Sequence, residues 1–470
     1  MYLNSQLAAK RRKATIISIS FIIIFSFQPP LYVHADISIK NPDLKAELVL
    51  KGLKSPTSMS FLAEGDFLVL EKDGLVQRIV GNSILENPVL NLTSIVNSTR
   101  ERGLLGIAIS NDTASSKDGN LDSNSNIYLY LTERIPNIIH NPCNINNCTM
   151  SRVVNSLYVY EMNAGQLVNP TLLLSIPFGN ADIGIEHLGG KITIGPDQRI
   201  YITGGDGYPC RNFEDCKKSI DKGQLNSKTS NSNGSDATGM GGILAISKDT
   251  KTNSSDSILG DFFPLNLYYA YGIRNSFGLD FDPRTGDLWD TENGPFFGDE
   301  INLVKPGSNS GWAKVQGIWP ITNYNMLVKD LPIGYSFPED HRAVNSGDLY
   351  DFNGNGKYTS PQFTWYDSIG ATALKFFNSN ELGEEYRDDM FVASYSKGRI
   401  YHFDLNEDRN SLATDIQLKN NVAYDENDLA DFIFAQGFGP ITDLQVSPDG
   451  FLYILSYEGN VWKITKSATS

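Results

Sequence analysis

The segment 186–207, EHLGGKITIGPDQRIYITGGDG, carries a histidine and an aspartate on either side of one predicted β-hairpin. His187 stands in a glycine-rich turn, and Asp206 follows the second strand. An imidazole accepts a proton near neutral pH, and a buried carboxylate beside it can fix the tautomer that does so. The same Gly, Pro and Asp residues are also ordinary turn punctuation. The segment is therefore consistent with a proton-transfer pair and with a purely structural turn.

A second group of polar residues lies in the segment 270–312. Arg274 and Asn275 stand at a predicted bend between a strand and a loop, where a guanidinium could reach a central opening. The turn ENGP then offers consecutive main-chain carbonyls at Gly294 and Pro295. Proline brings no N–H, and oxygen is the ligand that a hard calcium ion prefers. The alternative is a solvated β-turn followed by exposed acids.

The elements that must position these residues are short strands. Sustained helical stripes of apolar residues are missing from the sequence, and alternating runs ended by Gly, Asn or Asp turns recur instead. The runs are 66–79, 126–133 with 156–162, 199–206 with 241–247, 286–294 with 299–304, 389–405 and 450–464. Six similar units of about 70 residues predict an all-β fold, a six-bladed β-propeller with long inter-strand loops. A strand at 46–50 would complete the last blade. A pair of stacked β-sandwiches and a β-solenoid are the alternatives, which the irregular spacing disfavours.

The N-terminal residues 1–35 have the features of an export signal. A basic cluster at 10–13 precedes an apolar stretch at 14–27, and Val33 and Ala35 are small residues where a signal peptidase would cut. The apolar stretch is shorter than the roughly 20 residues of a spanning helix. We therefore expect a secreted or extracytoplasmic chain with one domain at 36–470 and no integral membrane domain after processing. An uncleaved N-terminal anchor is the alternative.

The charge of the chain excludes some partners. The formal net charge is −15, and removal of residues 1–35, which hold four cations and no acids, would make it −19. Such acidity argues against nucleic acid and anionic membranes as partners.

The cysteines fit an oxidising compartment. All four, Cys143, Cys148, Cys210 and Cys216, lie after the predicted signal. Bridges 143–148 and 210–216 are the simplest of the three possible pairings. Disulfides are favoured over zinc, because no CxxC pair occurs and no histidine stands at zinc-ligand spacing.

Four motifs resemble those of a known family. They are ERGLLGIAIS at 101–110, HLGGKITIGPDQRIYITGGD at 187–206, YGIRNSFGLDFDPRTGDLWDTENGP at 271–295 and GDEINLVKPGSNSGW at 298–312. In this order they resemble the glucose/sorbosone dehydrogenase family, and the likeness extends over roughly 45–465. Its best-understood members are soluble aldose dehydrogenases that depend on pyrroloquinoline quinone (PQQ), and it also has non-catalytic extracellular relatives. The resemblance implies a six-bladed propeller with the cofactor over a central funnel.

The resemblance implies a catalytic set. An aldose would be oxidised at the anomeric carbon to a lactone, with hydride passing to PQQ and electrons then to an external acceptor. His187 would be the general base, Asp206 would orient it, and Arg274 would stabilise negative charge on the quinone. The carbonyls of Gly294 and Pro295 would bind Ca²⁺.

Further residues would hold the cofactor and the sugar. By the same resemblance, Asn275 and Asn293 would line the cofactor, Lys397 would pair with a cofactor carboxylate, and Glu101 would face the sugar. Trp365 could stack on a ring ligand or pack in the core.

The chain also departs from the family pattern. Pro440 and Thr442 stand where the resemblance implies two arginines that clamp the cofactor's carboxylates. Arg399 and Lys375 are candidate substitutes. This departure supports a non-catalytic extracellular carbohydrate- or protein-binding propeller as the alternative function. A calcium-dependent lactonase is a third, and it would need a cage of side-chain carboxylates and amides.

Overall fold

The computed structural model divides the chain into two units, residues 1–34 and 35–470. The residues that it describes all belong to the second unit: 37–111, 125–135, 152–180, 186–207, 237–248, 257–295, 297–312, 315–317, 352–413, 418 and 421–467. The predicted signal at 1–35 and all four cysteines lie outside the described residues. Cleavage and disulfide pairing therefore stay predictions.

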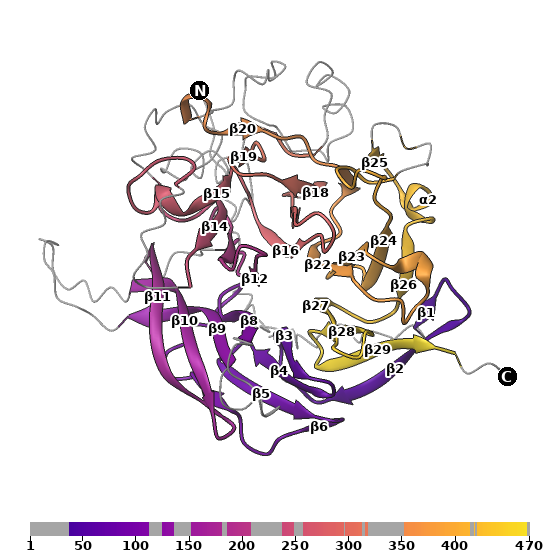
Figure 1. Ribbon diagram of the computed structural model, residues 1–470, viewed down its shortest axis with the longest axis horizontal. Coiled ribbons are helices and arrows are strands. Elements are labelled where there is room, and N and C mark those ends of the chain that lie inside the picture. The colour runs from indigo at the N-terminus through magenta and orange to yellow at the C-terminus, as the bar shows by residue number, and fades with distance from the viewer. Residues whose placement is uncertain are drawn as a thin grey trace, which may run out of the picture. The chain divides into compact units, whose positions relative to one another are not determined.

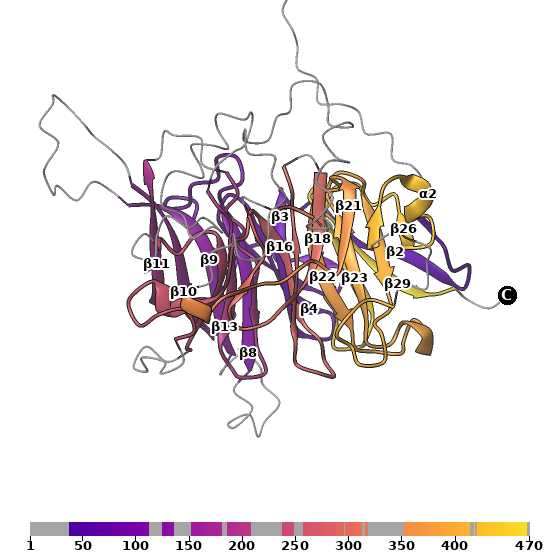
Figure 2. The same ribbon diagram turned by 90° about the horizontal axis from the view of Figure 1, so that it is seen from above.

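The described strands form six sheets around a central axis (Figure 1). In order along the chain these blades begin with β3, β8, β12, β16, β22 and β27, each the innermost strand of its sheet. The innermost strands contact one another in this order, and β27 contacts β3 again, so the ring is closed. Seen from the side, the strands run roughly along the axis (Figure 2). The six-bladed propeller predicted from the sequence is confirmed.

The first three blades begin in the first half of the chain, and blade 3 also includes two short strands from later segments. Blade 1 contains β3 (Pro56–Ala63), β4 (Asp66–Glu71), β5 (Leu75–Val80), β6 (Ser83–Ile84) and β7 (Leu90–Asn91). Blade 2 contains β8 (Leu104–Asn111), β9 (Ser125–Ile135), β10 (Arg152–Asn163) and β11 (Gln166–Asn180). Blade 3 contains β12 (Ile192–Ile194), β13 (Ile200–Gly204), β14 (Gly242–Ile246), β15 (Tyr268–Tyr271), β19 (Ser308–Asn309) and β20 (Lys357–Tyr358).

The other three blades complete the ring. Blade 4 contains β16 (Ser276–Phe281), β17 (Leu288–Glu292), β18 (Phe297–Val304), β21 (Phe363–Asp367) and β25 (Val422–Ala423). Blade 5 contains β22 (Ala371–Phe377), β23 (Asp389–Ser394), β24 (Arg399–Phe403), β26 (Ile433–Gln436) and β1 (Ser38–Ile39). Blade 6 contains β27 (Ile441–Val446), β28 (Leu452–Ser456), β29 (Asn460–Lys466) and β2 (Leu44–Lys51).

The N-terminal strand closes the ring. β2 pairs antiparallel with β29, with Ala46 opposite Ile464 and Leu48 opposite Trp462. The last blade therefore holds strands from both ends of the domain, as the sequence predicted for 46–50. The hydrogen bonds of this pairing must break before blade 6 can separate from the ring.

The core lies between the blades. Neighbouring sheets pack face to face through six hydrophobic clusters, one at each junction. Central strands such as β4 and β28 are buried on both faces, which explains their continuous apolar runs. Helical structure among the described residues is confined to single turns: η2 (Leu265–Leu267), η5 (Phe352–Gly354), η6 (Glu384–Tyr386) and α2 (Glu426–Leu429). In this part of the chain, a helix with the length and apolar character to span a bilayer does not occur.

Candidate active site

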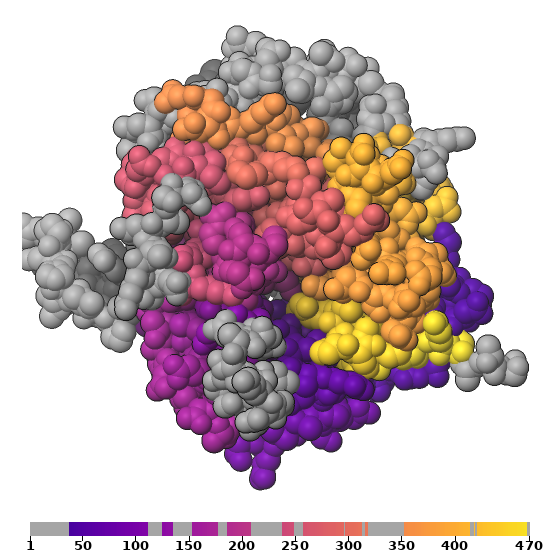
Figure 3. All heavy atoms as spheres, in the orientation of Figure 1, coloured from indigo at the N-terminus to yellow at the C-terminus, as the bar shows by residue number. Residues whose placement is uncertain are grey.

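A cavity of about 510 Å³ is lined by residues from all six blades. On the face shown in Figure 3, the blades meet around a small central hollow. Seven residues that the sequence predicted for the site line the cavity: Glu101, His187, Arg274, Asn275, Asn293, Gly294 and Pro295. Segments far apart in the sequence therefore meet at one opening.

The imidazole of His187 is held by a buried carboxylate. Its Nδ1 lies 2.7 Å from Oδ1 of Asp206, and the two side chains are 7% and 1% exposed. The other carboxylate oxygen accepts a hydrogen bond of 2.7 Å from the indole Nε1 of Trp312. Because an ionised carboxylate only accepts, it selects the tautomer with the proton on Nδ1. In this tautomer of the neutral imidazole, Nε2 carries the lone pair.

A glycine brings the histidine and arginine segments together. A Cβ on Gly205 would lie 2.2 Å from the carbonyl oxygen of His187 and 2.8 Å from that of Arg274. The two residues that follow bond these same carbonyls, Asp206 N to Arg274 at 2.7 Å and Gly207 N to His187 at 3.2 Å. The GGDG sequence therefore joins His187, Asp206 and Arg274 through the main chain.

Arg274 places a buried cation beside the base. Its Nη2 lies 3.1 Å from Nε2 of His187, and its Nη1 donates hydrogen bonds of 2.8 Å to the carbonyls of Asn293 and Gly294. The guanidinium also lies over the ring of Trp312, 5.5 Å from its centroid. Burial lowers the pKa of Arg274, and nearby carboxylates, Asp206 first, oppose that shift.

Glu101 and Asn275 fix the histidine from the other side. The main-chain N–H of His187 donates to Oε2 of Glu101 at 2.6 Å, and Nδ2 of Asn275 lies 3.4 Å from the same oxygen. Oδ1 of Asn275 accepts from the N–H of Gly189 at 3.3 Å. His187 itself has a φ of 58°, a left-handed conformation that non-glycine residues rarely adopt without support. These contacts supply that support.

Three residues of the ENGP turn, Asn293, Gly294 and Pro295, line the cavity. Asp299 is buried and clamps the turn, because its carboxylate accepts from Gly294 N at 2.9 Å and from Gly370 N at 2.8 Å. The side-chain amide of Asn293 donates a hydrogen bond of 2.8 Å to the carbonyl of Ala371. Asn293 therefore joins blades 4 and 5 and also lines the cavity. The Gly294 carbonyl accepts from Arg274 and keeps a second lone pair. Neutral carbonyl oxygens on a clamped turn suit a hard cation.

Buried acids lie in the same blade as this turn. Burial raises the pKa of Asp290 to about 7 and that of Glu300 to about 8. Burial also raises the pKa of Glu292, whose Oε1 accepts from the main-chain N of Arg274 at 2.6 Å. The alternative of exposed acids after this turn was wrong, because Asp299 and Glu300 lie on β18, which is buried along its whole length.

Two predicted cofactor residues lie away from the cavity. Trp365 is completely buried between blades 4 and 5, with its ring 4.8 Å from that of Phe363, so the core-packing alternative holds and the stacking role was wrong. Lys397 is not among the residues that line the cavity, and its Nζ lies 3.4 Å from Glu426. In this conformation its ammonium pairs with Glu426, so its contact with a cofactor carboxylate stays a prediction.

The candidate substitutes for the missing arginines are also engaged elsewhere. Arg399 pairs with Glu426, and Lys375 lies 3.1 Å from Asp280. Neither lines the cavity, whereas Thr442 does.

Several residues of the site were not predicted from the sequence. Trp312 stands in the quoted GSNSGW motif, but its bond to Asp206 spans 106 positions and has no local signature. The cavity is also lined by Lys72, Arg100 and Lys191, and by Tyr395 and Tyr457, whose ring centroids are 5.8 Å apart. Lys72 follows β4 and Lys191 precedes β12, and neither position has a sequence pattern that marks a binding residue. Only their place around the axis shows that they line the cavity.

Known proteins share this sequence pattern and fold. The quinoprotein glucose dehydrogenase B of Acinetobacter calcoaceticus is 24% identical over 505 aligned positions, which cover 100% of this chain and 97% of the relative. The apo soluble aldose sugar dehydrogenase of Escherichia coli superposes with a TM-score of 0.60 at 17% identity, covering 90% of this chain and 100% of that one. The PQQ-bound aldose sugar dehydrogenase of Streptomyces coelicolor gives 0.53 at 20% identity, covering 90% and 98%.

A model of one protein family matches nearly the whole described domain. The match covers residues 53–463, which include the innermost strand of every blade and all the described residues that line the cavity. The chain belongs to the glucose/sorbosone dehydrogenase family.

Proposed function

We propose that this protein oxidises aldose sugars at the anomeric carbon to lactones, with PQQ as hydride acceptor and His187 as general base. The observation that carries the proposal is one cavity in which an oriented imidazole, a buried guanidinium and clamped carbonyls lie together. Nε2 of His187 is 3.1 Å from Arg274, which is itself 2.8 Å from the Gly294 carbonyl. These are a base, a fixed positive charge and metal-ligand oxygens.

The residues present fit the family's cofactors. A volume of about 510 Å³ is in the range of cofactor pockets. Arg274 and Asn275 would contact the quinone, and the carbonyls of Gly294 and Pro295 would bind Ca²⁺, which prefers oxygen ligands. Bound PQQ would supply the two-electron acceptor for the hydride.

The chain's own residues would then move one proton. Nε2 of His187 would accept the proton of the anomeric hydroxyl as the hydride leaves the anomeric carbon, which leaves the lactone carbonyl. Asp206 would stabilise the imidazolium that forms, because it bonds Nδ1 at 2.7 Å. Glu101 lines the cavity and would orient the sugar while it holds the main chain of His187.

We also propose that the protein works outside the cytoplasm and passes electrons to an external acceptor. The basic and apolar pattern of residues 1–35 supports export, and the four cysteines fit an oxidising compartment. The net charge of −15 supports a small-molecule substrate over nucleic acid.

The test is reconstitution of purified protein with PQQ and Ca²⁺, followed by dye reduction with a panel of aldoses. His187→Ala should lower turnover by about 10²- to 10⁴-fold. His402→Ala is a matched control, because His402 also contacts a carboxylate, Asp389 at 2.9 Å, but does not line the cavity. Equal activity of His187→Ala and the wild type would refute the assignment of the base.

Thr442 lines the cavity and is neutral, whereas the family resemblance implies a cofactor-binding arginine at this position. This difference favours a second candidate, a binding propeller without turnover. Tight sugar binding with no dye reduction under any PQQ and Ca²⁺ condition would support it. The lactonase alternative has less support, because Glu101 is the sole carboxylate among the described residues that line the cavity.

A further inference from the structure

The charges around the cavity are distributed unevenly. The cationic side chains that line it all come from blades 1 to 4 and their connections: Lys72, Arg100, Lys191 and Arg274. Blades 5 and 6 contribute neutral residues: Gly370, Thr372, Tyr395, Ser396, Thr442 and Tyr457. The Thr372 hydroxyl donates to the carbonyl of Ile441 at 2.7 Å, and that of Thr442 donates to Leu455 at 3.3 Å. Among the described residues, an anionic group in the cavity therefore finds positive charge only on the side of blades 1 to 4.

Three of these four cations already have partners that use their charge or their donors. Lys191 forms an ion pair with Asp443, and Arg100 forms one with Glu186. Arg274 bonds to two carbonyls and lies beside the imidazole of His187. The charges or N–H donors of these three side chains are therefore already used by groups of the protein itself.

Lys72 differs from the other three. Its ammonium donates to the main-chain carbonyl of Arg100 and, within the described residues, forms no ion pair with a carboxylate. An ammonium has three N–H donors, so two remain for a ligand. The side chain is half-buried at the wall of the cavity, where a charge interaction is stronger than in open water.

The position of Lys72 is fixed by the main chain around it. Its N–H donates to Ser55 at 3.1 Å, and its carbonyl accepts from Leu104 N at 3.0 Å. Gly103 has a φ of 151°, and a Cβ there would lie 2.7 Å from Cγ of Lys72. The glycine of the ERGLLG motif therefore makes room for the lysine side chain against the site segment that carries Glu101.

We propose that Lys72 is the carboxylate-binding residue of this cavity, and that it pairs with a carboxylate of the bound ligand. The proposal rests on the proposed function. Two ligands could bring the carboxylate: the tricarboxylate cofactor PQQ, or an acidic aldose such as a uronic acid. In either case the anionic end of the ligand lies toward blade 1, across the ring from Arg274 in blade 4.

The experiment compares Lys72→Met and Lys72→Arg with the wild type in two measurements. The first is the Kd for PQQ in Ca²⁺-loaded protein, from an absorbance titration without sugar. The second is kcat/KM for glucose and for glucuronic acid at saturating PQQ. Lys51→Met is the control, because Lys51 is exposed on the outermost strand of blade 6. Melting temperatures establish that each variant is folded.

The two measurements distinguish whether PQQ or the sugar supplies the carboxylate. If PQQ supplies it, Lys72→Met should weaken PQQ binding by about tenfold, with recovery in Lys72→Arg, while the ratio of the two sugars stays the same. If the sugar supplies it, PQQ binding should stay the same and kcat/KM for glucuronic acid alone should fall by about tenfold. Lys51→Met should change neither quantity.

Failure of the two proposals gives different results. A wild-type protein that binds PQQ and oxidises sugar, with Lys72→Met equal to it in both measurements, overturns the role of Lys72 and leaves the proposed function standing. A wild-type protein that neither binds PQQ nor oxidises any sugar overturns the proposed function and this proposal with it.

Discussion

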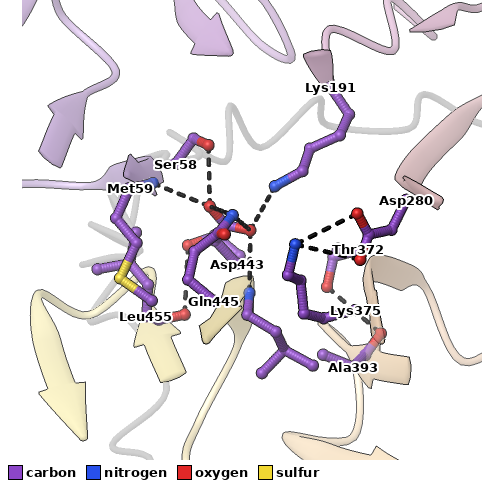
Figure 4. A network of polar contacts seen from close by, with 12 residues as sticks. Ser58, Met59, Lys191, Asp280, Thr372, Lys375, Ala393, Asp443, Gln445 and Leu455 are labelled. Carbon is purple, nitrogen blue, oxygen red and sulfur yellow. Dashed lines mark hydrogen bonds and ion pairs between the residues drawn. The ribbon is translucent and has the colours of Figure 1, made fainter. Parts of the chain in front are cut away.

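Two regions formed by the innermost parts of the blades differ in whether their buried cations form ion pairs with carboxylates. In the first, which we call the axial network, lysines meet carboxylates directly (Figure 4). Asp443 of β27 pairs with Lys191 and accepts bonds of 2.9 Å from Ser58 Oγ and Met59 N of β3. Lys375 of β22 lies 3.1 Å from Asp280 of β16. Every one of these contacts ties one blade to another.

In the second region, the cavity, the central cation has no such partner. Arg274 contacts carbonyls and an imidazole, and in the described part of the chain no carboxylate lies within ion-pair distance of its guanidinium. Its Nε has no hydrogen-bond partner among these residues. A charge that pairs within the protein stabilises the ring, whereas a charge left with neutral partners is available to a ligand. The presence or absence of a carboxylate partner therefore predicts whether a cation is structural or functional better than its residue type does.

The axial network should be the larger contributor to stability. Asp443→Ala would leave the Lys191 ammonium, whose side chain is 10% exposed, without its counterion, and would remove the acceptor for Ser58 and Met59. We expect the free energy of unfolding to fall by about 3–5 kcal/mol, the usual result of breaking a buried pair on one side. Urea denaturation measures it.

An exposed pair supplies the control for that measurement. Asp287→Ala removes the partner of Lys305, whose side chain is 49% exposed, and should cost less than about 1 kcal/mol. The double variant Lys191→Met/Asp443→Leu should recover part of the lost stability, since no buried charge then remains unpaired. Equal losses in Asp443→Ala and Asp287→Ala would contradict the structural role of the axial network.

The cavity cation should instead affect turnover. Arg274→Ala removes the fixed charge beside His187 and should lower kcat by about 10²- to 10³-fold, which is about 3–4 kcal/mol of transition-state stabilisation. Steady-state kinetics at saturating PQQ and Ca²⁺ measure the change. Arg199→Ala is the control, because Arg199 is paired with Asp197 outside the cavity and should leave kcat unchanged. An Arg274 variant with wild-type kcat and reduced stability would place Arg274 with the structural cations.

The sequence predicted the ring and the part of the cavity wall formed by His187, Arg274 and Gly294. Blade repeats, the closing strand and the motifs around His187, Arg274 and Gly294 are local patterns, because strand alternation and tight glycine turns are encoded by neighbouring residues. Asp206 was also found, since it lies only one hairpin away from its partner.

The remaining site residues depend on which strand ends meet around the axis. Lys72 and Trp312 enter the site through contacts between distant segments, which one sequence does not encode locally. Trp365 was assigned wrongly as a cofactor residue because an aromatic in a strand looks the same whether it faces a cavity or a neighbouring blade. Lys397 was carried over from a family motif, and its side chain reaches Glu426 instead.

Asp290 is a buried acid of a third kind. Within the described part of the chain it neither forms an ion pair nor lines the cavity. Asp290 on β17 is fully buried, and burial raises its pKa from 3.8 to about 7. The folded chain therefore binds this proton more tightly than the unfolded chain. The associated stability is fully present below about pH 4 and is lost as pH rises through about 7.

Asp290→Asn should remove this dependence. The variant should match the wild type near pH 4 and be more stable at pH 8 by about 1–3 kcal/mol. The measurement is the difference in unfolding free energy between the two proteins from pH 4 to 8. This difference includes the part of the raised pKa values of Glu292 and Glu300 that the Asp290 carboxylate causes. A variant that is less stable than the wild type at pH 8 would mean that Asp290 has a charged partner or a bound cation in solution.

The smallest expected effect tests how the cavity holds its base. Trp312→Phe keeps an aromatic ring near Arg274 but loses the hydrogen bond of 2.7 Å to Asp206. Asp206 would still bond Nδ1 of His187, so the tautomer should persist while the carboxylate gains freedom. We expect kcat to fall about fivefold, or roughly 1 kcal/mol, with KM and PQQ affinity unchanged. A change in PQQ affinity instead would show that Trp312 acts through Arg274, because the indole then supports the cation and not the acid.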